Sequence, residues 1–203
     1  SASIMKSTDI FSKTNLKLNL GCGNKKMEGF INIDSSAHCE PDIILNLTNT
    51  PYPFKSNSIN EIVMKSVIEH LPADPEKFLK ILQEIYRICQ HNAVIHIECP
   101  HPTHRWQVAD FTHQKAIHPE GIRLLSKKAC EKDIKKDSTA SPLAIIYDID
   151  FEMRDYACEV DPKCREHIEN LFGEFDFSKL DSYAYLFKDV ASKQKFKLIA
   201  KKL

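Results

Sequence analysis

Two glycines and an acid near the start of this 203-residue sequence have the types and spacing to bind a small ligand. In the segment LKLNLGCGNKKMEGFINID (16–34), Gly21 and Gly23 follow one short apolar run and Asp34 ends the next. Glycines let a ligand approach the backbone closely because they have no side chain. A carboxylate at a strand end can accept hydrogen bonds from both hydroxyls of a ribose. The pattern therefore predicts a site for a nucleotide-like ligand.

A histidine-rich segment is the second group of residues that could carry chemistry. The segment ECPHPTHRWQVADFTHQKAIHPEG (98–121) contains four of the nine histidines. A histidine near its ordinary pKa suits a base that removes a proton from an oxygen nucleophile. We expect His104 and His113 to be the candidate bases, Asp110 to orient one of them, and His101 to be a third candidate. Each histidine could instead be a surface or helix-capping group.

The same segment also contains possible metal ligands. Thiolates, imidazoles and carboxylates bind zinc and harder divalent ions. Such groups occur at Cys99, His101, His104, Asp110 and His113. Their spacing matches no structural zinc site, so the sequence predicts no bound metal.

Short apolar runs predict the strands that would position these residues. The predicted strands are 17–20, 30–33, 43–47, 61–64 and 93–98, and two later segments of alternating hydrophobicity, 144–153 and 195–203.

The clearest helix is predicted over 75–90. Asp74 can cap its first turn, the apolar side chains form one stripe, and His91-Asn92 is expected to end it. Further helices are predicted over 119–133 and from Asp161-Pro162 to Gly173. Strands that alternate with helices predict a mostly parallel sheet with both faces covered, and ligands then bind beyond the carboxyl ends of the strands.

The spacing in the glycine segment disfavours a dinucleotide. A dinucleotide site has a third glycine, where this chain has Lys26, and an acid about 20 residues further on, whereas Asp34 follows Gly23 by 11 residues. The nine residues 21–29 are too few for a full crossover helix. Without a helix N-terminus a pyrophosphate has little to bind. A ligand that has a ribose but no phosphate fits better, and S-adenosylmethionine is such a ligand.

Three segments in order resemble the class I S-adenosylmethionine-dependent methyltransferases, especially the small single-domain group with a Methyltransf_11-like core. They are LNLGCGNKKMEGFINID, then DIILNLTNTPYPFKSNSINEIVMKSVIEHL, then AVIHIECPHP after a helix, and together they span about residues 16–102. The resemblance implies an α/β, Rossmann-like fold: a seven-stranded, mostly parallel sheet with an antiparallel last strand and helices on both faces. It also implies one domain over 5–203, with 155–194 as a helical insertion between the last two strands.

The resemblance assigns roles to matching positions. Gly21, Cys22 and Gly23 would line the methionine tail of the cofactor, Asp34 would bind the ribose hydroxyls with Ser35 beside it, and Ser66 would contact the tail or sulfonium region. Asn46, Leu47 and Thr48 would flank the adenine, and His70 would stand in the pocket wall unless it serves only as a helix cap or hydrogen-bonding group. Two features depart from the family: the usual first helix is missing or reduced to a turn, and CQHNA replaces the frequent LKPGG.

Composition limits the partners of the chain. Lys plus Arg equals Asp plus Glu, 28 against 28, so a broad nucleic-acid-binding face is not expected. The sequence shows no secretion signal and no membrane span, and its seven cysteines read as reduced thiols. We therefore expect a cytoplasmic protein with a small-molecule substrate. Residues 1–4 precede Met5 and are taken as a cloning remnant.

The resemblance implies S-adenosylmethionine-dependent methyl transfer to a small polar acceptor, at oxygen, with S-adenosylhomocysteine as the product. A sugar or a carboxylate-type metabolite would suit the histidine-rich segment. The alternatives are a nitrogen acceptor, a non-catalytic module that binds the cofactor, and a dehydrogenase. The sequence does not specify the acceptor or the oligomeric state.

Overall fold

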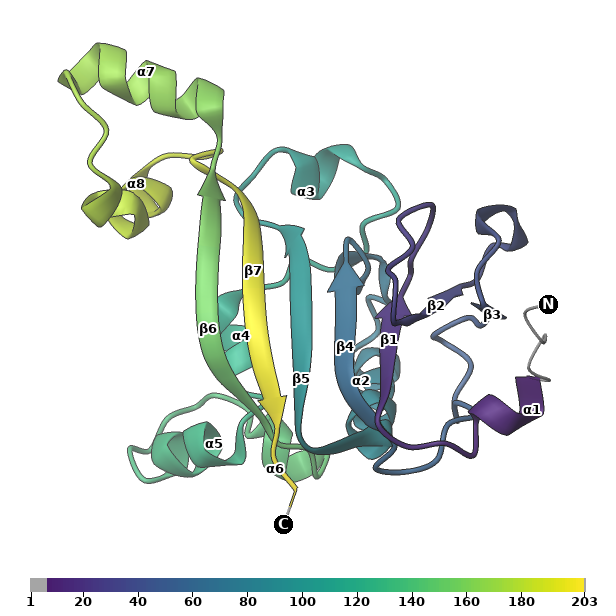
Figure 1. The fold of residues 1–203 in the computed structure, drawn as a ribbon. Helices are drawn as coiled ribbons and strands as arrows, with labels where there is room; N and C mark the ends of the chain where they lie inside the picture. The colour runs from purple at the N-terminus through teal and green to yellow at the C-terminus, as the bar shows by residue number, and fades with distance from the viewer. Residues whose placement is uncertain (1–6, 203) are drawn as a thin grey trace.

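The structure is a computed structural model that describes residues 7–202. Seven strands form one sheet in the order β3-β2-β1-β4-β5-β7-β6 (Figure 1). The first five strands are parallel, and β7 is antiparallel to both of its neighbours, β5 and β6. This order and the antiparallel last strand confirm the predicted fold class. The strands are β1 Leu16–Leu20, β2 Ile31–Asp34, β3 Ile43–Ile44, β4 Ile59–Lys65, β5 Cys89–Pro100, β6 Phe151–Val160 and β7 Ala191–Ala200.

The helices are concentrated in the second half of the chain. The α-helices are α1 Ser7–Ile10, α2 Pro75–Ile88, α3 Trp106–Ala109, α4 Pro119–Arg123, α5 Lys127–Ile134, α6 Leu143–Ile146, α7 Pro162–Phe172 and α8 Leu180–Leu186. Three 3-10 turns accompany them: η1 Ala37–Cys39, η2 Ile68–His70 and η3 Phe177–Lys179. None of the helices between residues 7 and 202 is long and apolar enough to cross a membrane.

Most predicted elements form close to their expected positions, with three differences. The segment 144–153 is not one strand, because α6 occupies its first residues and β6 begins only at Phe151. The predicted helix 119–133 is divided into α4 and α5, since Ser126 caps a new helix by accepting a hydrogen bond from the N–H of Ala129. Asn92 does take the predicted left-handed conformation, but it lies inside β5, which starts directly after α2.

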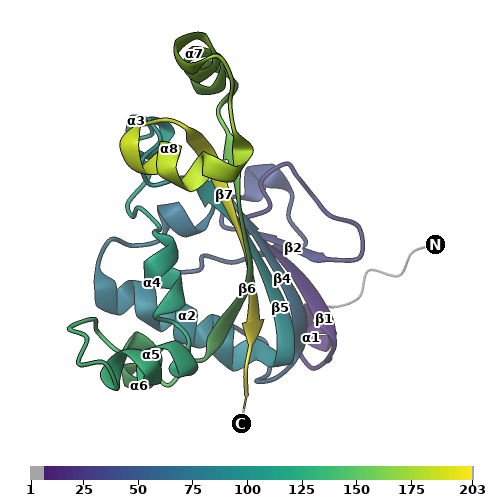
Figure 2. The same cartoon turned by 90° about the vertical axis from the view of Figure 1, so that its left-hand side faces the viewer.

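The helices cover mainly one face of the sheet, which corrects the expectation of helices on both faces. Figure 2 shows α2, α4, α5 and α6 on the same side of the sheet. The helix of a right-handed crossover lies on one face of the sheet when the next strand is added on one side, and on the opposite face when the next strand is added on the other side. Helices on the second face would therefore lie in the connections from β1 to β2 and from β2 to β3. Those connections contain only the turn η1, as the departure from the family pattern suggested.

The second face of the sheet is polar as a result. On β5, Ile95 and Ile97 are buried toward the helices, while the alternate residues His96 and Glu98 face the other way and are partly exposed. Ion pairs link the strands across this face: Lys17 Nζ to Glu61 Oε2 at 2.8 Å, His96 Nε2 to Glu61 Oε1 at 3.5 Å, and Lys195 Nζ to Glu98 Oε2 at 3.8 Å.

Helix α2 anchors the long connection between β3 and β4. Its residue Glu84 is 8% exposed. The carboxylate of Glu84 accepts hydrogen bonds from the N–H of Tyr52, at 2.5 Å, and from the side chain of Arg87, and so connects these two residues. Arg87 also donates to the carbonyls of Tyr52 and Phe54. The hydroxyl of Tyr52 in turn donates to the carbonyl of Leu47 at 2.9 Å. This clamp holds the residues that follow β3 at the edge where the parallel strands end.

The segment between β6 and β7 packs on a core of its own. Asp161 caps α7 and Gly173, with a positive φ, ends it as predicted. Ile168, Phe175 and Val190 form a small buried cluster separate from the main core. Figure 1 shows α7 and α8 beyond the end of β6, at the same edge of the sheet as α3.

We expect Glu84→Gln to lower the free energy of unfolding by about 1–3 kcal/mol at pH 7, because hydrogen bonds to a charged group are lost. Burial raises the pKa of Glu84, but hydrogen bonds from Arg87 and the Tyr52 N–H outweigh burial and leave the pKa lowered. Because the pKa of Glu84 is lower in the folded state, its carboxylate stabilises the folded protein at pH values above the unfolded-state pKa of about 4.3. This stabilisation is lost as the pH falls through the folded-state pKa.

The difference between Glu84→Gln and the wild type should therefore shrink from pH 7 to pH 3, as measured by urea unfolding. The matched control is Glu76→Gln in the same helix, whose pair with Lys80 is exposed and should contribute little to stability. An effect of Glu84→Gln that is no larger than that of the control would contradict the clamp.

Candidate functional site

A cleft of about 270 Å³ lies at the carboxyl ends of β1, β2 and β4. Its lining comprises Gly21, Asp34, Ser35, Leu45, Asn46, Leu47, Thr48, Ser66, Val67, His70 and Leu71. Eight of the ten sequence-predicted cofactor residues thus meet in one cleft, and Cys22 and Gly23 are the two that do not line it. The side chains converge because parallel strands bring their carboxyl ends to the same edge of a sheet.

The turn after β1 passes close to the segment after β4. Gly21 has φ +63°, and a Cβ at this position would lie 2.4 Å from Cγ2 of Val67. Glycine is therefore required here both by the backbone conformation and by the contact. The backbone of Cys22 is already occupied, since its N–H donates to the carbonyl of Ile33 and its carbonyl accepts from Lys25.

Asp34 joins the two loops at the base of the cleft. Its Oδ2 accepts from the N–H of Gly23 at 2.9 Å, and its Oδ1 accepts from the N–H of Ser36 at 2.9 Å. The N–H of Gly23 is therefore directed at a carboxylate rather than at the cleft. Each oxygen of an ionised carboxylate has two lone pairs, so Asp34 can accept one further hydrogen bond at each oxygen.

The opposite wall is formed by the residues after β3. The side chain of Asn46 accepts hydrogen bonds from both the N–H and the hydroxyl of Thr48, at 2.9 and 2.8 Å. Leu47 is buried and its carbonyl is held by Tyr52. This wall is thus a fixed turn with two apolar side chains, Leu45 and Leu47, which suits a flat aromatic group.

The residues after β4 form the third wall. Ser66 has φ +55°, and its N–H donates to the carbonyl of Glu98 at 2.8 Å. His70 contacts Thr112 through Nδ1, at 3.3 Å to the carbonyl and 3.1 Å to the hydroxyl. His70 therefore both lines the cleft and forms a structural hydrogen bond, so the two predicted roles coexist.

Among the four predicted catalytic residues, His113 and Asp110 lie next to the cleft. The ring of His113 packs on that of His70, with 4.7 Å between centroids. Asp110 Oδ2 lies 3.7 Å from His113 Nε2, while Asp110 Oδ1 accepts from the N–H and hydroxyl of Thr112. These hydrogen bonds lower the pKa of Asp110, so its carboxylate stays ionised near His113.

His104 and His101 do not line the cleft, and their rings contact other parts of the chain. His104 is 2% exposed, and its Nε2 lies 3.2 Å from Oδ2 of Asp161, the residue that caps α7. His101 is buried and its Nδ1 contacts the hydroxyl of Thr103 at 2.9 Å. Burial lowers the pKa of His101, which disfavours its charged form.

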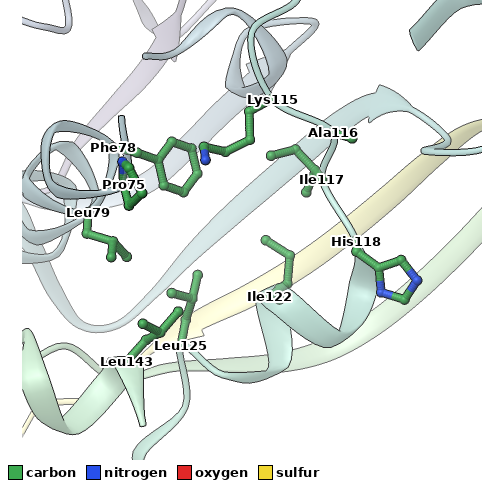
Figure 3. A pocket seen from close by; sticks show the side chains of 11 residues that line it. Pro75, Phe78, Leu79, Lys115, Ala116, Ile117, His118, Ile122, Leu125 and Leu143 are labelled. Atoms are coloured by element: carbon green, nitrogen blue, oxygen red, sulfur yellow. The ribbon is translucent and has the colours of Figure 1, made fainter. Parts of the chain in front are cut away.

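An apolar hollow of about 210 Å³ lies elsewhere, between α2 and α4 (Figure 3). None of its lining residues belongs to the cleft. The ammonium of Lys115 lies 4.9 Å from the ring centroid of Phe78, and His118 caps α4 by accepting from the N–H of Glu120. The polar groups of this hollow are thus already engaged in packing and capping.

Sequence reasoning assigned no role to Val67 and placed Glu69, together with His70, where the family often has a Glu-His pair at the pocket wall. Val67 closes the cleft against Gly21, and a glycine that no larger residue could replace is the signal for such a contact. Glu69 is fully buried beside His70 and His113.

We expect Gly21→Ala to destabilise the protein more than Gly23→Ala. Both glycines have positive φ, so an alanine is strained at either position, but only at Gly21 does the new methyl group meet another side chain. Urea unfolding of the two variants and of Gly21→Ala/Val67→Ala measures the contact. The double variant should recover part of the loss, and an equal loss in both single variants would show that the contact is unimportant.

We also expect His104→Gln to loosen the segment 161–190, because the pair with Asp161 connects the histidine-rich loop to the cap of α7. Limited proteolysis should cut this segment at least several-fold faster than in the wild type. His167→Gln, on the exposed surface of α7, is the control and should leave the rate unchanged. Equal rates in His104→Gln and wild type would assign no anchoring role to His104.

Comparison with known proteins supports the fold. No protein-family model and no curated protein sequence matches this chain. Among solved structures, an S-adenosylmethionine-dependent methyltransferase from Archaeoglobus fulgidus is similar with a TM-score of 0.51 and 20% identity, over 95% of this chain and 88% of the other. Another from Mesorhizobium loti has a TM-score of 0.50 and 10% identity, over 93% and 92%. The chain therefore has the fold of the class I S-adenosylmethionine-dependent methyltransferases, as its sequence resemblance predicted.

Proposed function

We propose that this protein is an enzyme that transfers a methyl group from S-adenosylmethionine to an oxygen atom of a small polar acceptor, leaving S-adenosylhomocysteine. One observation carries the proposal: Asp34 and Gly21 meet at the base of a cleft at the carboxyl edge of the sheet. Gly21 lines the cleft with its backbone alone, and Asp34 has free lone pairs for two hydroxyls. The connection after β1 has no helix, which fits a ligand without phosphates.

The walls of the cleft fit the remaining parts of this cofactor. The turn of Asn46, Leu47 and Thr48 would flank the adenine, and Ser35 would stand beside the ribose. Gly21 and Ser66 would be next to the amino-acid tail. The neighbouring residues Cys22 and Gly23 support this site through their hydrogen bonds to Ile33 and Asp34 and would not contact the cofactor through those N–H groups.

In methyl transfer the protein mainly orients the reactants and accepts a proton. S-adenosylmethionine supplies an activated methyl group when bound. The residues of the cleft would then orient the acceptor, and His113 would accept the proton that its hydroxyl loses. Asp110 would stabilise the protonated form of His113 from 3.7 Å. We favour His113 over His104 and His101 because these two do not line the cleft and their rings contact Asp161 and Thr103.

The acceptor class follows from the polar character of the cleft mouth. His70, Thr112 and Asp110 are hydrogen-bonded groups beside the His113 ring. Such groups suit a sugar or a carboxylate-type metabolite better than an apolar acceptor.

Calorimetric titration with S-adenosylhomocysteine tests the cofactor site. We expect micromolar binding by the wild type and at least tenfold weaker binding by Asp34→Ala, because hydrogen bonds to a charged group each contribute about 1.5–3 kcal/mol. Asp34→Asn should lie between them, since an amide retains one acceptor.

Asp155→Ala, on the polar face of the sheet, is the control and should bind like the wild type. Circular dichroism would confirm that each variant is folded. A folded wild type that does not bind, or an Asp34→Ala variant that binds equally well, would refute the assignment. Binding without turnover across a panel of hydroxyl and carboxylate acceptors would favour a non-catalytic module instead.

A further inference from the structure

A buried carboxylate stands without a partner next to the cleft. Glu69, in the turn η2, is 0% exposed, and neither of its carboxylate oxygens has a hydrogen-bond partner among residues 7–202. An ionised carboxylate in such a place is costly unless a positive charge lies close to it. Burial raises the pKa of Glu69 accordingly. A cation bound beside Glu69 would offset the cost of burying its unpartnered carboxylate.

Two histidines lie within reach of this carboxylate. One ring nitrogen of His70, one of His113 and one carboxylate oxygen of Glu69 all lie within 4.8 Å of one another. The two rings meet edge to face, at an interplanar angle of 70°. Three donor atoms at such separations can converge on one ion with a small adjustment of side-chain torsions.

The hydrogen bonds of both histidines to the neighbouring loop use the same ring nitrogen, Nδ1. His70 Nδ1 is placed to donate to the carbonyl and hydroxyl of Thr112, and His113 Nδ1 to the carbonyl of Gln107 at 3.3 Å. A proton on each Nδ1 leaves a lone pair on each Nε2. Metal-bound histidines are typically oriented in this way, by a hydrogen bond from the other ring nitrogen to a backbone carbonyl or carboxylate.

We propose that Glu69, His70 and His113 bind a divalent transition-metal ion in the wall of the cleft. Two imidazoles and one carboxylate suit Mn²⁺, Fe²⁺ or Zn²⁺, whereas Mg²⁺ prefers oxygen ligands and waters. Asp110, whose Oδ2 lies 3.7 Å from His113 Nε2, adds negative charge beside the site.

Three protein ligands leave coordination positions open. Because His70 also lines the cleft, an acceptor hydroxyl could occupy one of them. The ion would lower the pKa of that hydroxyl, its proton would pass to solvent, and His113 would serve as a ligand rather than as the base. This role of the ion rests on the proposed methyl transfer, whereas binding of the ion does not.

Titration of the chelator-treated full chain with Mn²⁺, followed by electron paramagnetic resonance, tests the site. Mn²⁺ is the suitable probe because it binds thiols weakly and the chain has seven free cysteines. We expect one equivalent to bind to the wild type, and at least tenfold weaker binding to Glu69→Gln and to His113→Gln. His167→Gln, which removes an exposed histidine far along the chain, should bind like the wild type.

Thermal melting gives a second readout that does not depend on activity. With Mn²⁺ the wild type should gain stability and Glu69→Gln should not. Absence of Mn²⁺ binding by the wild type, or equal binding and equal stabilisation in Glu69→Gln, would overturn the proposal. Titration with S-adenosylhomocysteine in chelator measures the cofactor site separately, so failure of one proposal is distinguishable from failure of the other.

Discussion

The side chain of Asn32 is the constraint on which the cleft depends. It is buried, and its Oδ1 accepts hydrogen bonds from Asn19 Nδ2 at 3.0 Å and from the N–H of Met27 at 2.8 Å. Its Nδ2 donates to Asp42 Oδ2 at 3.0 Å. One amide thus connects β1, the loop after it and the segment before β3. In a parallel crossover this fixing is normally done by a helix packed on the sheet, and here a polar network replaces it.

This replacement has consequences for both the sheet and its ligand. Without helices after β1 and β2, the second face of the sheet is covered by charged side chains that pair across strands, such as Glu61 with Lys17 and His96. At the carboxyl edge, no helix N-terminus is directed at the cleft from the connection after β1. The dominant group there is the carboxylate of Asp34. A cleft with this electrostatics discriminates against phosphates and favours a neutral or cationic ligand with hydroxyl groups.

The parts of this arrangement that the sequence could predict are those decided by neighbours along the chain. The turn at Gly21, the acid at Asp34 and the cap of α2 at Asp74 all depend on local conformation, and they occur where the sequence indicated. The segment 144–153 was predicted wrongly because alternating hydrophobicity does not report burial: Ile145 and Ile146 are exposed on α6. The second face of the sheet is uncovered because the connections after β1 and β2 contain no α-helix. These connections lie far from β7 in the sequence, so the residue pattern within β7 could not predict that its second face is uncovered.

The histidine-rich loop shows most clearly why the catalytic assignment needed the structure. His104 and His113 are the same residue type and belong to the same loop after β5, yet their partners lie 57 residues later, at Asp161, and 43 residues earlier, at His70. The loop is fixed at two points: by His104 and Arg105 at its start, which bind Asp161 and Asp189, and by backbone bonds from Gln114 and Lys115 to the carbonyl of Glu69 at its end. The second anchor brings His113 to Glu69 and His70. The same backbone contact that fixes the end of the loop therefore assembles the only cluster of three potential metal ligands found among the described residues.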